Sequence, residues 1–160
     1  MRLNMGSMKK TSSPFPPPAL TVLGLARASA DSNATCPLYL TPVNAGWPSA
    51  AEDYIDAQIN LHELLVRNPA ATFFLRAAGE SMLGVGIHDG DLLVVDRSLE
   101  AGHNRVVIAA LEGELLVKKL CRREGRVFLQ SANPGYPEFD ITEREYAHIW
   151  GVVSHVVHKL

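Results

Sequence analysis

The sequence predicts a mainly β fold, in which a compact domain of short strands follows an extended N-terminal arm. From residue 71 onward, short apolar and β-branched runs alternate with Gly, Asp and Asn, a pattern typical of strands and turns. Closely spaced prolines and serines mark the first 46 residues, and proline both blocks helix and removes a backbone donor. We therefore expect a flexible, Pro/Ser-rich arm at 1–46 and a β-rich domain at 47–160.

Two short helices are expected at the start of the domain. Ser49-Ala50-Ala51-Glu52 has the capping-box pattern, so a helix should continue to about Ala57. Asn60-Leu61-His62-Glu63 repeats this signal, and Asn68-Pro69 should end the second helix.

The remaining elements of the domain are expected to be strands. Their ranges are 71–77, 91–96, 105–111, 114–121, 126–130 and 148–157. Leu111-Glu112-Gly113-Glu114 has the composition of a hairpin turn, so the two strands on either side of it should pair.

Composition excludes several classes of protein. The chain has 160 residues, a net charge of −2 and no basic block, which argues against direct, sequence-specific DNA binding. It has no run of about 18 apolar residues, so no membrane span is predicted. Residues 1–10 lack the apolar stretch of a secretory signal, and we expect a cytoplasmic protein.

The cysteines and histidines predict neither a metal site nor a cofactor. Cys36 and Cys121 fit no metal or redox spacing and are expected to be free thiols. The six histidines are scattered along the chain. His155 and His158 are three residues apart in a predicted strand, so their side chains should face opposite ways.

A serine and a lysine are the candidate chemical groups. Ser81 lies in a Gly-Glu-Ser-Met turn, and Lys118 lies in a predicted strand between Leu116 and Leu120 at two-residue spacing. Taken singly, such a serine is usually a turn residue and such a lysine usually extends to solvent. Burial among leucines would instead lower the lysine pKa. A fall of roughly 3 units, which costs on the order of 4 kcal/mol, would make it half neutral near pH 7.

A neutral lysine can take the proton of a serine hydroxyl, which is otherwise a poor nucleophile. We therefore interpret Ser81 and Lys118 as a Ser-Lys dyad, a known variant of the serine-hydrolase arrangement. Lys119 is the rival base, but strand alternation turns its side chain to the opposite face.

The sequence around these residues resembles the self-cleaving LexA/UmuD peptidase family, and its UmuD members most closely. The resemblance rests on Ser81-Met82 followed by 84–96 (GVGIHDGDLLVVD), with Val117-Lys118-Lys119-Leu120 downstream. It extends over about 43–158. The family commonly has Gly-Asp where this chain has Asn104-Arg105, which should change that turn.

The resemblance implies a role for particular residues. Ser81 would be the nucleophile of a serine peptidase and Lys118 its general base. The scissile bond would be Ala45-Gly46, where two small residues allow close approach of the backbone. We assign the oxyanion hole to the backbone N–H groups of Glu80 and Ser81.

The resemblance also implies a function in SOS mutagenesis. A RecA filament on single-stranded DNA would stimulate self-cleavage. The trimmed homodimer would then act as accessory subunit of a Y-family translesion DNA polymerase, with a UmuC-like catalytic subunit. The apolar strand at 148–157 could supply a dimer face, although packing in the core explains the same pattern.

Three other functions are compatible with parts of this pattern. A LexA-like repressor would need a DNA-reading helix-turn-helix, for which 1–45 are too short and too rich in proline. A signal-peptidase-like enzyme would use the same dyad but would need a membrane anchor. A non-enzymatic interaction module would carry Ser81 and Lys118 as relics.

Overall fold

The computed structural model describes residues 21–28, 34–39 and 55–160 of the chain. In chain order its elements are β1 (Thr21–Arg27), β2 (Cys36–Tyr39), β3 (Ile55–Ile59), α1 (Leu61–Leu65), β4 (Thr72–Ala78), the 3-10 turn η1 (Leu83–Val85), β5 (Leu92–Asp96), β6 (Val106–Leu111), β7 (Glu114–Arg123), β8 (Arg126–Gln130), β9 (Phe139–Asp140) and β10 (Ala147–Val157). The predicted mainly β fold is confirmed.

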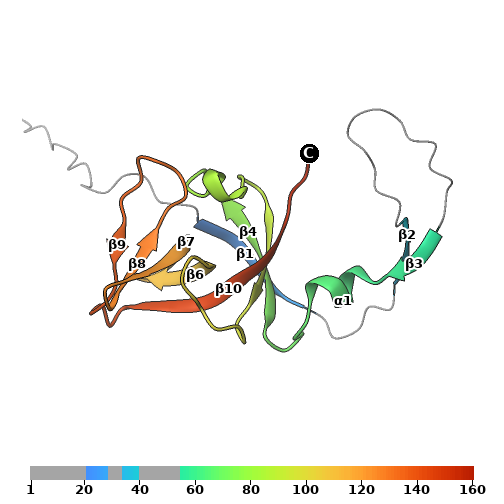
Figure 1. Ribbon diagram of the computed structural model, residues 1–160, viewed down its shortest axis with the longest axis horizontal. Helices are drawn as coiled ribbons and strands as arrows, with labels where there is room; N and C mark the ends of the chain where they lie inside the picture. The colour runs from blue at the N-terminus through green and yellow to red at the C-terminus, as the bar shows by residue number, and fades with distance from the viewer. Residues whose placement is uncertain (1–20, 29–33, 40–54) are drawn as a thin grey trace, which may run out of the picture.

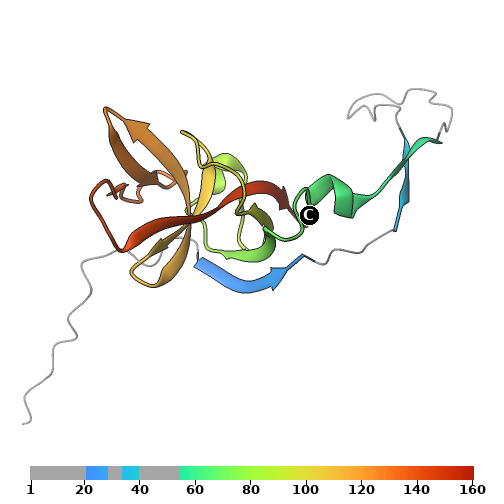
Figure 2. The same ribbon diagram turned by 90° about the horizontal axis from the view of Figure 1, so that it is seen from below.

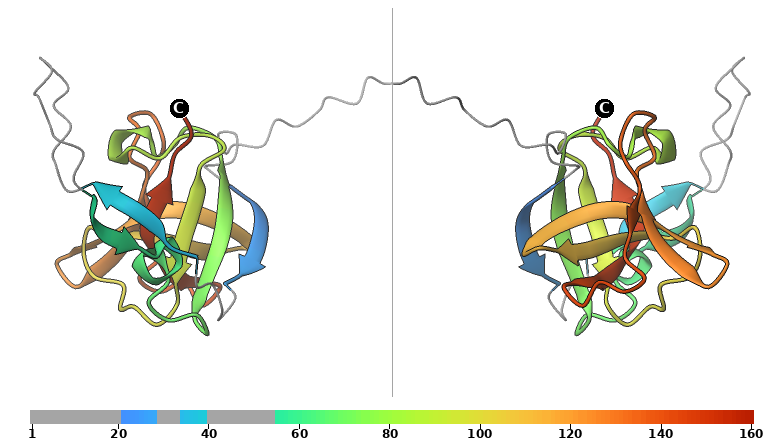
Figure 3. Two further views of the ribbon diagram at one scale, coloured as in Figure 1. Left: turned by 90° about the vertical axis from the view of Figure 1, so that its right-hand side faces the viewer. Right: turned by 90° about the vertical axis from the view of Figure 1, so that its left-hand side faces the viewer.

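One curled antiparallel sheet forms the body of the molecule. Its strand order is β1-β4-β5-β10-β6-β7-β8-β9, and a further pairing of Thr21 with Leu116 brings β1 against β7 (Figures 1 and 3). β2 and β3 form a separate two-stranded sheet, which α1 links to the body (Figures 1 and 2). Two strands, β1 and β2, therefore lie within the segment predicted as the arm.

The six predicted strands are confirmed as β4, β5, β6, β7, β8 and β10. The hairpin between β6 and β7 is also confirmed, since Leu111 pairs with Glu114. The two residues between them, Glu112 and Gly113, have φ of 52° and 86°. Positive φ at both central positions is the conformation that a two-residue hairpin needs to match the twist of its strands.

The second predicted helix is confirmed as α1. Asn60 caps it, because its side-chain oxygen accepts the N–H groups of His62 (2.9 Å) and Glu63 (3.3 Å). The first predicted helix is wrong over residues 55–57, which belong to β3; its residues 50–54 lie outside the described ranges. The capping pattern is a local preference, and pairing of β3 with β2 overrides it with hydrogen bonds from a distant segment.

The two faces of the sheet carry two apolar clusters. The first includes Leu75, Met82, Leu93, Ile108 and Val117, and the second includes Val107, Ala109, Leu120, Leu129 and Val152. At roughly 2 kcal/mol for each buried large side chain, these clusters are the main source of stability.

Strand β10 lies in the middle of the sheet. It pairs with β5 on one side and with β6 on the other, and its residues Val152 and Val153 are buried. This part of the predicted apolar strand therefore packs in the core. Of the two interpretations of its apolar pattern, core packing is favoured over a dimer face. Among the residues that the structure describes, no helix has the length and apolar character to cross a bilayer.

Candidate active site

Lys118 is a fully buried cation in the middle of β7. Its side chain has no solvent-exposed surface, and Leu116 and Leu120, two residues away on the same face, are buried with it. Lys119 points to the other face and is half-buried. Burial lowers the Lys118 pKa from its ordinary value of 10.5 to about 8. The burial predicted for this lysine and the downward direction of its pKa shift are confirmed, but a pKa of about 8 is above the value needed to make the amine half neutral near pH 7.

The surroundings of the Lys118 amine are polar on one side and aromatic on another. Nζ donates a hydrogen bond of 2.5 Å to Ser131 Oγ. It also lies 5.9 Å from the ring centroid of Tyr136 and 5.5 Å from that of Phe139. Within the described part of the chain, no carboxylate lies at ion-pair distance from this amine. A lysine without a counter-ion is the one most easily deprotonated.

Ser81 is also fully buried, in the turn that follows β4. The next residue, Met82, inserts into the first apolar cluster and so fixes the turn to the core. The Ser81 carbonyl accepts the N–H of Ala132 at 2.9 Å, and the Glu80 carbonyl accepts Nδ2 of Asn133 at 2.9 Å. The serine turn is thereby bonded to the segment that follows β8.

Gly84 allows this close contact between the serine turn and Ala132. Its N–H donates to the Ala132 carbonyl at 2.7 Å. A Cβ at position 84 would lie 2.2 Å from that carbonyl oxygen, which is too close for any residue other than glycine. Substitution there would push the turn away from residues 131–133.

Ser81 and Lys118 therefore meet the same dipeptide, Ser131-Ala132, one through a backbone bond and the other through its side chain. Sequence reasoning missed Ser131. A serine just after a strand carries no distinctive signal, and only its place opposite Lys118 makes it part of the site. Ala45 and Gly46 lie outside the described residues.

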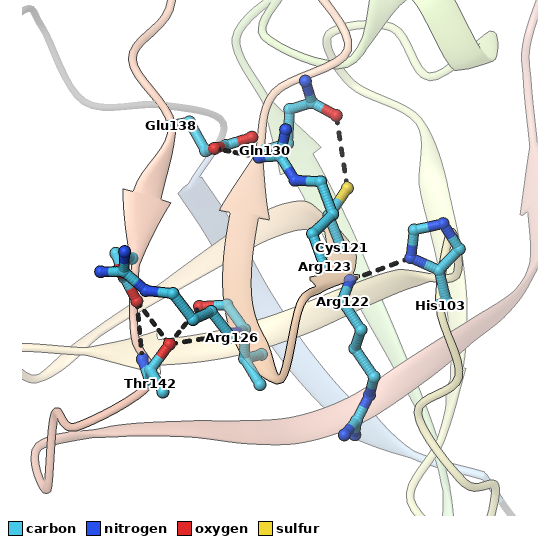
Figure 4. Close-up of polar contacts among 10 residues, drawn as sticks. His103, Cys121, Arg122, Arg123, Arg126, Gln130, Glu138 and Thr142 are labelled. Atoms are coloured by element: carbon cyan, nitrogen blue, oxygen red, sulfur yellow. Dashed lines mark hydrogen bonds and ion pairs between the residues drawn. The ribbon is translucent and has the colours of Figure 1, made fainter.

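The wall of the site that faces Lys118 is held by ion pairs at the outer end of the sheet. Arg123 on β7 pairs with Glu138, and Arg126 on β8 pairs with Asp140 on β9 (Figure 4). Hydrogen bonds from Thr142, with a contribution from Arg126, lower the Asp140 pKa. These contacts hold the segment with Tyr136 and Phe139 against the β7–β8 hairpin.

The same end of β7 is also bonded to the turn where the sequence departs from the family pattern. Asn104 adopts a left-handed φ of 62°, which asparagine tolerates better than most residues. Its N–H donates to the Leu120 carbonyl at 2.7 Å, and the Leu120 N–H donates to the Arg105 carbonyl at 2.9 Å. The changed turn thus still pairs with the strand that carries Lys118.

Three possible metal ligands, His88, Asp91 and His158, gather at a second polar site next to β5. The sequence did not indicate this cluster, since two of its members precede β5 and the third follows β10. His155 is not part of it; its Nδ1 lies 3.1 Å from Ser154 Oγ.

Comparison with known proteins places the chain in a family. The Peptidase S24-like family model matches residues 37–154, a range that includes Ser81 and Lys118. The chain is similar to Protein MucA of Salmonella typhimurium, with 48% identity over 74% of this chain and 82% of that protein. It is 44% identical to Protein ImpA of Shigella flexneri over 82% of this chain and 89% of that protein.

Similarity extends more weakly to a repressor. The LexA repressor of Vibrio cholerae is 36% identical over 62% of this chain, but this covers only 47% of the repressor. The similarity to MucA and ImpA is both higher and more complete. The chain therefore belongs to the Peptidase S24-like family of self-cleaving serine peptidases, as a UmuD-type protein of SOS mutagenesis.

Proposed function

We propose that this protein cleaves its own chain between Ala45 and Gly46, with Ser81 as nucleophile and Lys118 as general base. The observation that carries the proposal is the environment of Lys118. Its amine is fully buried, lacks a carboxylate partner among the described residues and has a pKa lowered to about 8. At pH 7 about a tenth of the molecules then hold it neutral, against fewer than about one in a thousand for an ordinary lysine.

The bond to Ser131 supports the same assignment. A neutral amine has two N–H groups and one lone pair. Donation of one N–H to Ser131 Oγ fixes the rotation of the amine and leaves its lone pair to accept a proton from elsewhere. We assign that proton to the Ser81 hydroxyl.

The reaction then follows the usual order of acyl transfer. Lys118 takes the hydroxyl proton while Ser81 Oγ bonds to the Ala45 carbonyl carbon, and the carbonyl oxygen becomes an anion. When the carbon–nitrogen bond breaks, the Gly46 nitrogen takes the proton from Lys118 and leaves as a new amino terminus. Water, deprotonated by the same lysine, releases Ala45 from Ser81 as a carboxylate.

The oxyanion needs fixed donors, for which we propose the backbone N–H groups of Glu80 and Ser81. The carbonyls of these two residues are bonded to Asn133 and Ala132, and such bonds hold the turn rigid. A rigid turn keeps its donors oriented before the anion forms, which is the condition for strong electrostatic stabilisation.

Cleavage within the same polypeptide is fast once the scissile segment occupies the site, because effective molarities of well-oriented reactions reach on the order of 10⁵ M. Control must then act on how often the segment is bound there. We propose that a RecA filament on single-stranded DNA raises this population. The trimmed homodimer would then serve, in the cytoplasm, as accessory subunit of a UmuC-like Y-family polymerase.

The proposal is tested by incubating the full-length protein with RecA, single-stranded DNA and a nucleotide, followed by mass spectrometry. We expect fragments 1–45 and 46–160 from the wild type and from Ser154→Ala, a serine on β10 distant in sequence from the serine turn. Ser81→Ala should remain intact while keeping its thermal unfolding transition. Cutting of Ser81→Ala at the same bond would disprove the assignment, and specific binding to duplex DNA would favour the repressor function instead.

A further inference from the structure

A second polar site lies where the chain beyond β10 meets the loop before β5. His158 Nδ1 lies 2.6 Å from Asp91 Oδ1, and His88 Nδ1 lies 3.7 Å from Asp91 Oδ2. The possible ligand atoms of the three residues all lie within 4.8 Å of one another. Pairing of Val157 with Leu92 in the sheet produces this juxtaposition, because it places the residues just beyond each of them side by side.

The three side chains differ in exposure in a way that suits an ion arriving from solvent. The Asp91 side chain is 2% exposed, whereas those of His88 and His158 are 47% and 41% exposed. The carboxylate is also fixed in orientation, because its Oδ2 accepts the backbone N–H of His88 at 2.8 Å. A fixed buried anion with two exposed imidazoles at its outer side is a partly built coordination site.

The chemistry of the cluster favours binding of a divalent cation over protonation of both imidazoles. The two imidazole rings are 4.6 Å apart, and two imidazolium cations at that distance repel each other. One metal ion can instead use two neutral imidazoles and one carboxylate together, and these are the protonation states that metal binding requires. Nitrogen and oxygen ligands of this kind, three from protein with positions left for water, suit Zn²⁺.

We propose that His88, Asp91 and His158 form a Zn²⁺ site. Around a tetrahedral zinc the ligand atoms are about 3.3 Å apart, so the exposed imidazoles have to close on the ion. Coordination through His158 Nδ1 replaces its bond to Asp91 and requires the proton to move from Nδ1 to Nε2 or to leave, whereas coordination through Nε2 keeps that bond. No bond to the polypeptide is made or broken, and the proposal does not depend on self-cleavage.

The ion would join the C-terminal tail to the loop that supports the serine turn. In that loop Asp89 Oδ1 accepts the Gly79 N–H at 2.7 Å, and the Gly90 N–H donates to the Ala77 carbonyl at 2.9 Å. Residues 77 and 79 lead directly to Ser81. A bound ion would therefore stabilise both the tail and the loop next to the serine turn, a structural function rather than a catalytic one.

The test uses the full-length protein, freed of metal by a chelator and of any affinity tag. Zn²⁺ titration by calorimetry should give one site per chain, and Zn²⁺ should raise the thermal unfolding temperature. Co²⁺ should give the visible absorption of a bound ion and be displaced by Zn²⁺. His88→Ala and His158→Ala should each weaken binding at least tenfold, while His148→Ala, which removes an exposed histidine of β10, should leave it unchanged.

Both histidines of the site are on the surface, so the Ala variants should fold; equal unfolding temperatures in chelator would verify this. Absence of one-to-one Zn²⁺ binding in the wild type would overturn the proposal. So would equal affinity in the His88→Ala/His158→Ala double variant, because the ion would then be held by other groups such as the free thiol of Cys36.

Discussion

Lys118 and Asp91 are both buried ionisable side chains, but their surroundings shift their charge states in opposite directions. Both are removed from solvent. Burial alone acts on Lys118 and lowers its pKa to about 8, toward the neutral form. Burial should raise the Asp91 pKa, yet the bond from the His88 backbone and the bond and charge of His158 outweigh it and lower that pKa. Lys118 is thus pushed toward losing its charge, and Asp91 is held charged.

The difference shows that burial decides the charge state of a group only where no hydrogen-bond donor or charge outweighs it. Lys118 has a neutral hydroxyl and aromatic rings around its amine. Asp91 has two donors aimed at its oxygens. A buried charge without compensation is costly and is easily lost, whereas one that accepts hydrogen bonds from fixed donors is retained. The fold places the first kind in the proposed catalytic site and the second in a connection between loop and tail.

The largest effect is expected from Lys118→Met, which keeps the volume and removes the amine. Self-cleavage should be lost, because no base remains for Ser81. The variant should also be more stable than the wild type at pH 7 by up to about 3 kcal/mol, the cost of a pKa lowered from 10.5 to about 8. Urea unfolding and mass spectrometry measure the two changes.

The stability gain should depend on pH in a defined direction. Below pH 8 the amine is protonated in both states and the cost is complete. Between about 8 and 10.5 the folded protein has lost the proton that the unfolded chain keeps, so the free energy of unfolding of the wild type rises with pH. The stability gain of Lys118→Met should therefore vanish near pH 10.5. An equal gain at pH 7 and at pH 10.5 would contradict this account. Lys119→Met, on the half-buried face, should change stability by less than about 0.5 kcal/mol.

A smaller effect of opposite sign is expected from Asp91→Asn. The amide replaces one acceptor oxygen by a donor, which then faces the N–H of His88 or Nδ1 of His158. The free energy of unfolding, measured in chelator, should fall by about 1–3 kcal/mol. Asp89→Asn keeps an oxygen for the Gly79 N–H at an exposed position and should cost less; an equal loss would place the effect in the loop instead of the buried carboxylate.

The smallest effect is expected from the pH profile of self-cleavage without RecA. The wild-type rate should rise about tenfold from pH 7 to 9 as Lys118 becomes neutral, and then level off. Ser131→Ala should lower the plateau by about five- to tenfold, because one hydrogen bond no longer orients the amine. It should also move the midpoint to lower pH, because the ammonium loses an acceptor. Ser131→Thr should restore both, and an unchanged profile in Ser131→Ala would exclude the positioning role.

Local patterns in the sequence predicted the parts of this protein that depend on local preference. Alternation predicted six strands and the burial of Lys118, and the Asn60 cap predicted α1. The prediction of a helix was wrong at residues 55–57. A helix-capping pattern precedes them, but they form a strand that pairs with β2. That pairing brings together segments about twenty residues apart in the sequence. A pattern of a few consecutive residues therefore cannot predict it.

The sequence alone determined the mainly β class, the serine turn and a lysine on the apolar face of its strand, because side-chain alternation and turn chemistry act over a few residues. Only the tertiary structure decided which residues surround that lysine and that carboxylate. Sheet pairing brought Ser131 to Lys118 and His158 to Asp91. The charge state of a buried group depends on those neighbours, and they come from strands that are distant along the chain.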